Sequence, residues 1–346
     1  MNIEKELKDI SLELSEEEYR NSSELHYSTI SRYEEKGFNG LDHLFDPIES
    51  PSLTFGGVCD TLLTEGEQAF KDKYLVVDIN LTDGGINTCK QLIEMHLPYS
   101  TFEEIPEQAV STAAKLAGFY ADDKYDKTRY QKVLKTGNIA DYYQVLLSAD
   151  KIVISTEMYN EATACVKALR ESPATLGYFA DDDPFSPIKR YYQLKFKADI
   201  DGVGYMVMAD VIVVDYEKKI VYINDLKTMG FPEWNFEDNF LRFHYYQQAR
   251  LYYRVIKANL DNDPYFKDFK IENFRFIVVN KNTLTPLVWE FPFTKAEGDL
   301  IDDKGNVIKD PCTLGKELKE YLDCRPQVPK GIIKDGINII NCLKKA

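Results

Sequence analysis

The sequence lacks the closely spaced cysteines and histidines that mark metal or redox motifs. Its six cysteines are scattered along 346 residues without a CxxC pair, which argues against a zinc ribbon or a thioredoxin-type site, and we interpret them as reduced thiols. The four histidines show no metal-ligand spacing. The phosphate-binding pattern GxxxxGK[ST] is also missing, so nothing points to a fused motor ATPase.

Long apolar runs and an excess of positive charge are missing too. No run approaches the roughly 18–20 apolar residues that a membrane helix needs, so we expect no membrane partner. The acidic N-terminus has no signal-peptide core, which makes a cytoplasmic location the default expectation. A net charge of −15 argues against a protein that coats nucleic acid, but not against an enzyme with a local basic groove.

The hydrophobic pattern changes from helical to strand-like along the chain. Residues 88–170 show mostly helical spacing, whereas strands are predicted at 191–198, 204–215, 220–227, 274–280 and 287–293, with a helix at 240–260. This order predicts an α/β fold with one mixed central sheet flanked by helices and a helical N-terminal half. We expect an acidic arm or helix at 1–20, a single domain at 21–325 and a basic tail at 326–346. Within that domain, the helical part covers about 21–180 and the sheet core about 190–295.

The segment from Asp210 to Lys227 carries the chemistry. Antiparallel pairing of the two strands would bring Asp210 and Asp225 together at one edge of the sheet, and Asp225 and Lys227 share a face because side chains alternate. Two neighbouring carboxylates repel, so they favour a hard divalent cation, which can activate water and polarise a phosphate. A lysine beside them can stabilise transition-state charge. Such a motif is common on solvated surfaces without any function, but the flanking residues here are strongly apolar.

The helix that follows supplies a second polar pair. Gln248 and Tyr252 lie four residues apart and share a helix face. They are therefore candidates for holding a phosphate or the attacking water, and the alternative is a tyrosine-rich helix that only packs on the sheet. His244 lies one turn before Gln248 and is a candidate substrate contact, as is Arg250.

These residues together resemble the PD-(D/E)XK nuclease superfamily. The resemblance is closest to its RecB-like branch of phage exonucleases, the exonuclease VIII (RecE) and YqaJ-like group. YSTIS at 27–31 is similar to the family's opening serine motif, which makes Ser28 a substrate-binding candidate. GGVCD at 56–60 looks like the helix that usually supplies a metal-binding histidine, and the DLK and QARLY segments match the catalytic core and its QxxxY helix.

The resemblance implies a restriction-endonuclease-like fold and a metal-dependent nuclease. It implies Mg²⁺ or Mn²⁺ held by Asp210, Asp225 and the backbone carbonyl of Leu226, with catalytic roles for Lys227, Gln248 and Tyr252. One departure is that Asp60 occupies the histidine position, where it is either a substituted ligand or a position that has lost its role. The four-cysteine iron–sulfur cluster of some relatives is not expected, because Cys312, Cys324 and Cys342 are too far apart.

Three functions remain open from the sequence. The leading hypothesis is a DNA exonuclease of phage-type recombination, replication or repair, acting on duplex ends with a single-strand annealing partner, in the host cytoplasm for a phage-encoded protein. The alternative is a catalytically inactive, nuclease-derived DNA-binding or assembly protein, which the acidity and Asp60 favour. A third is an unrelated α/β scaffold with an accidental motif. Glu157, on a helix before the sheet core, is a further candidate acid, and a solvated helix face is the alternative. Its role, cleavage polarity, DNA against RNA and assembly into a homo-oligomer are not determined by the residues.

Overall fold

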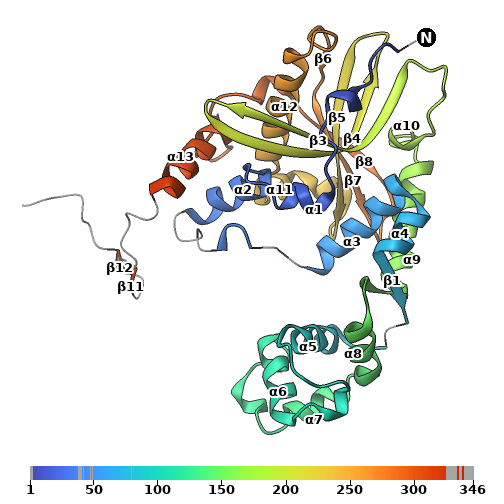
Figure 1. Cartoon of the computed structure of the whole chain (residues 1–346), viewed down its shortest axis with the longest axis vertical. Coiled ribbons are helices and arrows are strands. Elements are labelled where there is room, and N and C mark those ends of the chain that lie inside the picture. The colour runs from blue at the N-terminus through green and yellow to red at the C-terminus, as the bar shows by residue number, and fades with distance from the viewer. Residues whose placement is uncertain are drawn as a thin grey trace, which may run out of the picture. The chain divides into compact units, whose positions relative to one another are not determined.

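The computed structural model describes residues 3–37, 41, 43–46, 48, 50–78, 80–324, 333–334 and 337–338. The chain forms two compact units, one made of residues 1–49 and 171–346 and the other of residues 50–170. The predicted domain limits at residues 20 and 325 remain predictions, and most of the predicted basic tail lies outside the described residues. Figure 1 colours the chain from the N-terminus to the C-terminus.

The first unit contains the mixed sheet. Its strands are β3 (Ile188–Ile200), β4 (Val203–Asp215), β5 (Ile220–Met229), β7 (Phe274–Asn280) and β8 (Leu287–Phe291), hydrogen-bonded in the order β3-β4-β5-β7-β8. The β3–β4, β4–β5 and β7–β8 pairs are antiparallel, whereas β5 and β7 are parallel. The short β6 (Lys270–Ile271) also pairs with β5. The predicted fold class, a mixed sheet flanked by helices, is confirmed.

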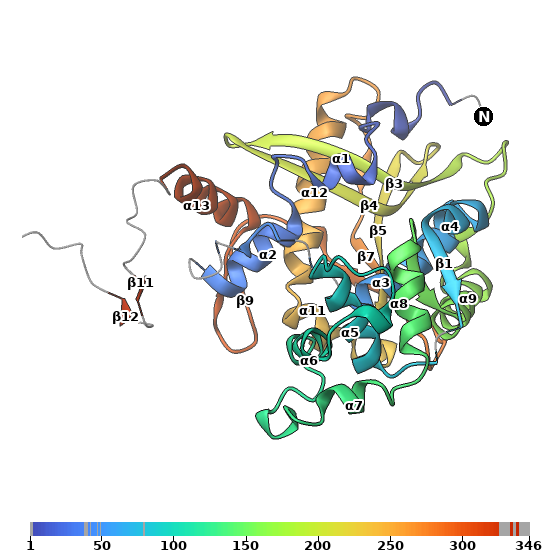
Figure 2. The ribbon, with the colours of Figure 1, turned by 60° about the horizontal axis from the view of Figure 1, so that its bottom comes forward.

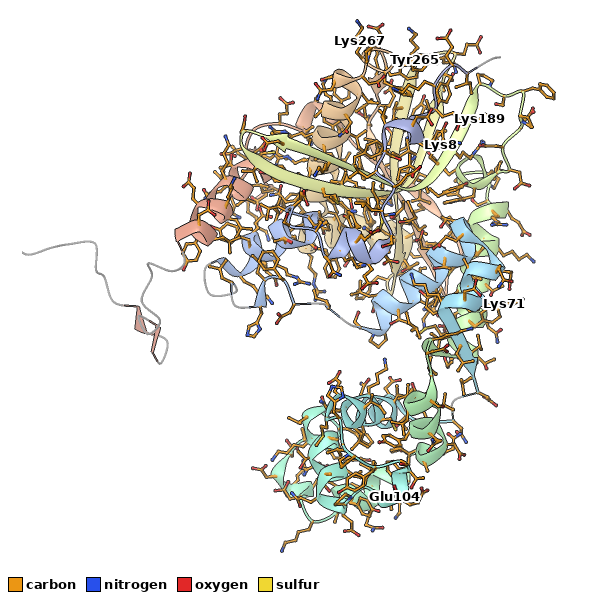
Figure 3. All side chains as sticks on the ribbon, in the orientation of Figure 1. Lys8, Lys71, Glu104, Lys189, Tyr265 and Lys267 are labelled. Carbon is orange, nitrogen blue, oxygen red and sulfur yellow. The ribbon has the colours of Figure 1, made fainter. Side chains whose placement is uncertain are left out.

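Helices cover this sheet because their apolar faces join its core. The long α12 (Tyr245–Asn262) packs against β3 and β4, and α2 (Tyr27–Lys36) and α13 (Pro311–Cys324) pack beside it, as Figures 1 and 2 show. The other helical elements are η1 (Leu7–Ile10), α1 (Glu16–Arg20), α10 (Leu176–Phe179), η6 (Glu233–Asn235), α11 (Phe236–Arg242) and η7 (Phe293–Lys295). Two-residue strands complete the unit, at β9 (Leu300–Ile301), β10 (Val307–Ile308), β11 (Ile333–Lys334) and β12 (Ile337–Asn338). Apolar side chains fill the space between the elements, whereas lysines such as Lys267 extend away from the ribbon in Figure 3.

The second unit is mostly helical, as the N-terminal pattern predicts. Its helical elements are α3 (Pro51–Asp60), η3 (Thr61–Glu65), α4 (Glu67–Lys73), α5 (Asp83–Glu94), η4 (Phe102–Glu104), α6 (Glu107–Leu116), η5 (Asp123–Tyr125), α7 (Arg129–Val133), α8 (Ile139–Ser148) and α9 (Thr156–Glu171). The strands β1 (Tyr74–Val77) and β2 (Ile152–Ser155) pair in parallel. Among the helices of the described residues, none has the length and apolar character needed to cross a membrane.

Two predictions differ from the structure in detail. The predicted helix at 240–260 is divided into α11 and α12, because His244 adopts a left-handed backbone conformation with φ 55°. The predicted arm at 1–20 holds two short helices, and Ser15 caps the second by accepting a hydrogen bond from the Glu18 backbone N–H. The strands agree with prediction to within a few residues, since apolar runs bounded by turn residues are a strong signal.

Candidate active site

Asp210 and Asp225 lie at an interruption in the sheet. The β4–β5 register ends at Val211 opposite Asn224, so Asp210 and Asp225 are the next residues on the two strands. The β3–β4 register omits the same level, because it passes from the pair Tyr192–Val211 to the pair Leu194–Ala209. The regular ladder is therefore interrupted on both sides of Asp210.

The backbone at this level is irregular as well. Gln193, which lies opposite Asp210, has φ 54°. A residue other than glycine in this conformation costs on the order of 1–3 kcal/mol, and such residues concentrate at functional sites. The Leu226 backbone N–H donates to the Asp210 carboxylate, at 2.9 Å, and not to a backbone carbonyl of β4. This bond orients Asp210 toward β5 and the DLK segment.

Lys227 pairs directly with Asp225. Lys227 Nζ lies 2.6 Å from Asp225 Oδ2, as expected for alternate residues on one face of a strand. Burial lowers the pKa of Lys227, but the Asp225 carboxylate and the nearby Tyr245, Tyr27 and Asp210 raise it, and the net shift is upward. Lys227 is therefore a protonated cation at neutral pH.

Helix α12 contributes the polar groups on the other side of Asp225. Gln248 donates a hydrogen bond from Nε2 to Asp225 Oδ1. Tyr252 lies one turn further on and is also buried. Burial raises the pKa of Tyr252 well above its ordinary value, and neighbouring Tyr19, Asp225 and Asp210 raise it further, while a hydrogen bond with Gln248 opposes the shift. Asp225, Lys227, Gln248 and Tyr252 thus form one buried polar group on β5 and α12.

The donor set at this site suits a hard divalent cation. Asp210, Asp225 and the Leu226 carbonyl offer only oxygen atoms, which Mg²⁺ and Mn²⁺ prefer. Asp225 Oδ2 is buried, and among the described residues its ion pair with Lys227 is its one polar contact. These residues fit the implied metal. No group of three or more His, Cys, Asp or Glu side chains suited to a metal occurs within the described residues.

Asp60 and Glu157 belong to the other compact unit. Asp60 is the last residue of α3, and its backbone carbonyl accepts a hydrogen bond from Thr64 Oγ1 at 2.9 Å. Glu157 lies in the first turn of α9. Their roles at the metal site remain predictions.

The three predicted substrate contacts differ in exposure. Ser28 is exposed in the first turn of α2. His244 is half-buried, and its Nδ1 lies 2.7 Å from the Glu34 carboxylate. Arg250 is wholly buried and bonds to Asp310 and to the carbonyls of Gly298 and Lys309. The side chain of Arg250 points into the protein, and its contact with the substrate stays a prediction.

Two tyrosines at the site were not predicted. The ring of Tyr245 lies 4.5 Å from Lys227 Nζ, a cation–π distance. Tyr245 precedes Gln248 by three residues, so helical spacing could have identified it. Tyr27 lies on α2 and affects the pKa of Lys227, and its hydroxyl donates to the Phe243 carbonyl at 2.7 Å. Tyr27 belongs to the YSTIS segment, for which the family resemblance implied a substrate contact at Ser28, but about two hundred residues separate it from β5.

Comparisons with known proteins found a similar chain among solved structures. No protein-family model matches the sequence, and no curated protein sequence matches it either. Among solved structures, one similar chain is from Eubacterium rectale and is described as a "putative exonuclease". The likeness has a TM-score of 0.48 at 12% sequence identity and covers 97% of this chain and 96% of that one. The residues of the site, rather than this likeness, carry the functional argument.

Proposed function

We propose that this chain is a divalent-metal-dependent deoxyribonuclease, an exonuclease of phage-type recombination, replication or repair. The observation that supports it most is the placement of Asp210 beside the Asp225–Lys227 pair at the interruption in the sheet. A carboxylate pair, an adjacent protonated lysine and a positioning amide are the groups that phosphodiester hydrolysis needs.

Each residue has a separate task in this proposal. Asp210, Asp225 and the Leu226 carbonyl would hold Mg²⁺ or Mn²⁺, which when bound supplies charge neutralisation and activation of water. Gln248 fixes the orientation of Asp225, and the Leu226 N–H fixes that of Asp210. Lys227 places a positive charge where negative charge develops on the phosphate.

The finer parts of the proposal come from the family resemblance. They are DNA duplex ends as substrate, a single-strand annealing protein as partner and the cytoplasm as location. Assembly into a homo-oligomer is left open. None of these rests on the contacts described above.

The direct test uses end-labelled linear DNA and closed circular DNA. With Mg²⁺ or Mn²⁺ we expect the linear DNA to be degraded and the circular DNA to survive, and EDTA should stop the reaction. Asp225→Asn should abolish degradation, because it removes a charged metal ligand. A matched control is Asp215→Asn, since Asp215 is also buried but ends β4 opposite Ile220, away from Asp225, and should leave cleavage intact. Undiminished cleavage by Asp225→Asn would refute the proposal.

One observation favours the inactive alternative. Both carboxylate oxygens of Asp225 already face protein groups, Gln248 on one side and Lys227 on the other. A calorimetric titration with Mn²⁺ separates the two functions. A nuclease should bind the ion, and Asp225→Asn should weaken that binding, whereas an inactive descendant should show no binding that depends on Asp225.

A further inference from the structure

A row of cations and aromatic rings leads from the candidate active site to the surface. Lys227 Nζ lies 4.5 Å from the Tyr245 ring, and the centroids of the Tyr245 and Phe243 rings are 5.7 Å apart. The Arg242 guanidinium lies 5.4 Å from the Phe243 ring. We call Arg242, Phe243 and Tyr245 the Phe243 platform. Since its inner end contacts Lys227, the platform is continuous with the site.

The backbone of the platform is held in a fixed position. Tyr27 donates its hydroxyl to the Phe243 carbonyl at 2.7 Å. The next residue, His244, has a left-handed backbone and is held by the Glu34 carboxylate at 2.7 Å and by the Tyr246 hydroxyl at 2.6 Å. A left-handed residue other than glycine persists only where its surroundings determine it. These contacts hold α11 and α12 so that the Phe243 ring is presented with 46% of its surface exposed.

Other exposed aromatic side chains follow β5 directly. Phe231 and Trp234 are 55% and 58% exposed in the segment after Met229. Between them, Glu233 is fully buried, and its carboxylate accepts the backbone N–H groups of Asn280 and Thr285, each at 3.0 Å. The strand that carries Asp225 and Lys227 therefore leads into an anchored segment that exposes two large rings.

The charge beside Phe243 indicates what these rings contact. Arg242 is exposed, and among the described residues no carboxylate pairs with it. An apolar protein partner would not need an unpaired cation there. Nucleic acid offers both matching groups, because every base has a π face for an aromatic ring and every nucleotide has a phosphate for a guanidinium.

We propose that Phe243 stacks on an unpaired base of the DNA strand next to the scissile phosphate, while Arg242 contacts a phosphate of that strand. This inference rests on the proposed function and extends it, because it makes an unpaired end, rather than a closed duplex, the bound form of the substrate. Aromatic stacking tolerates every base, so the platform would bind DNA without sequence preference.

The test measures binding of a labelled duplex with a short single-stranded extension at low ionic strength, in EDTA so that the DNA stays intact. A second duplex has abasic sugars in the extension and thus the same phosphates without bases. For the wild-type protein we expect the abasic extension to weaken binding by about 5- to 150-fold, the effect of losing one to three kilocalories of stacking per base. Phe243→Ala should lose a similar factor on the normal DNA and show little further loss on the abasic DNA.

Two further variants separate stacking from other effects. Phe243→Trp keeps an aromatic face and should bind like the wild type. Phe293→Ala is the matched control, because Phe293 is 44% exposed and stacks beside Tyr253 but is separate from the platform. Equal binding of normal and abasic DNA by the wild type, or an unchanged base dependence in Phe243→Ala, would overturn the inference alone. Absence of binding to either duplex would overturn it together with the proposed function.

Discussion

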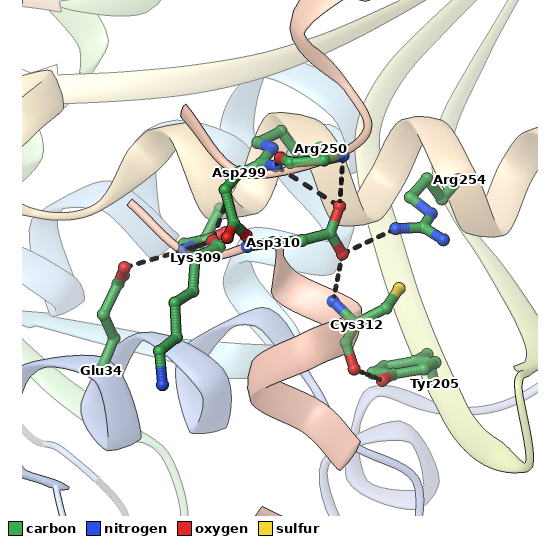
Figure 4. A network of polar contacts seen from close by, with 10 residues as sticks. Glu34, Tyr205, Arg250, Arg254, Asp299, Lys309, Asp310 and Cys312 are labelled. Carbon is green, nitrogen blue, oxygen red and sulfur yellow. Dashed lines mark hydrogen bonds and ion pairs between the residues drawn. The ribbon is translucent and has the colours of Figure 1, made fainter. Parts of the chain in front are cut away.

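Helix α12 contacts two buried carboxylates that are bound in different ways. On one side, Arg250 and Arg254 both reach Asp310, with N–O distances of 3.4 Å and 2.7 Å (Figure 4). Asp310 also accepts the backbone N–H groups of Gly298 at 2.9 Å and Cys312 at 2.8 Å. Each oxygen of Asp310 therefore has a cation and a backbone donor.

Asp225 is as deeply buried, but it has fewer partners. Gln248 binds one of its oxygens, and within the described part of the chain the other forms just the ion pair with Lys227. Burial of a charge is costly, so a carboxylate that serves structure alone is expected to be fully hydrogen-bonded, as Asp310 is. The difference teaches that burial alone does not separate the proposed metal ligand Asp225 from the structural acid Asp310, whereas their hydrogen bonding does.

Replacing the fully hydrogen-bonded carboxylate of Asp310 should have a large effect on stability. Asp310→Asn leaves the buried charges of Arg250 and Arg254 without their counter-ion, so we expect the free energy of unfolding to fall by about 3–5 kcal/mol. Urea denaturation measures this fall. Asp299→Asn is the control, because Asp299 is an exposed member of the same network and accepts the Asp310 backbone N–H at 2.9 Å. Its effect should not exceed about 1.5 kcal/mol. A similar loss in both variants would show that the ion pairs of Asp310 contribute no more to stability than the single hydrogen bond of Asp299.

Removing the cation beside Asp225 should lower the rate of cleavage. Lys227→Ala removes positive charge from the reacting phosphate, and we expect turnover of linear DNA to fall by about 10²–10³-fold. Mn²⁺ binding should remain close to that of the wild type, since lysine is not a ligand. Lys218→Ala breaks another lysine–aspartate pair of the same sheet, Lys218–Asp215 at 3.1 Å, and should leave turnover unchanged. A fully active Lys227→Ala would mean that the DLK segment has been misinterpreted.

The parts of the fold that are governed by local pattern could be predicted from the sequence. β4 and β5 are strongly apolar and joined by a short polar turn, so their antiparallel pairing, and with it the opposition of Asp210 and Asp225, follows from the spacing. The left-handed conformation of His244 could not be predicted. It depends on Glu34, which lies 210 residues away and holds the histidine ring. A continuous helical pattern therefore gave one predicted helix where the structure has two.

Side-chain direction on α12 could not be predicted from the sequence. Arg250 was expected on the substrate surface, but its partner Asp310 lies 60 residues later in a segment without a distinctive pattern. Helical spacing does place Gln248 and Tyr252 on one face and Arg250 and Arg254 on another. It does not show which face meets β5, because that depends on how α12 packs against the sheet.

The smallest expected effect comes from comparing two adjacent glutamines on different sides of α12. Gln247 and Gln248 are adjacent buried glutamines, but Gln247 donates to Glu34 and the Lys309 carbonyl, each at 2.9 Å, whereas Gln248 donates to Asp225. A hydrogen bond to a charged group contributes about 1.5–3 kcal/mol. Gln248→Ala frees the Asp225 carboxylate to reorient, so turnover should fall by about 10- to 150-fold and the half-saturating Mn²⁺ concentration should rise.

Gln247→Ala should show the opposite pattern, a loss of stability with the Mn²⁺ requirement unchanged. Steady-state cleavage at a series of Mn²⁺ concentrations, combined with urea denaturation, measures both quantities on both variants. If Gln248 only filled space, its replacement would lower stability as Gln247→Ala does and leave the metal requirement where it was. A shift in the metal requirement confined to Gln248→Ala would assign its amide to positioning Asp225, and the same shift in both variants would show that the two sides of α12 are not independent.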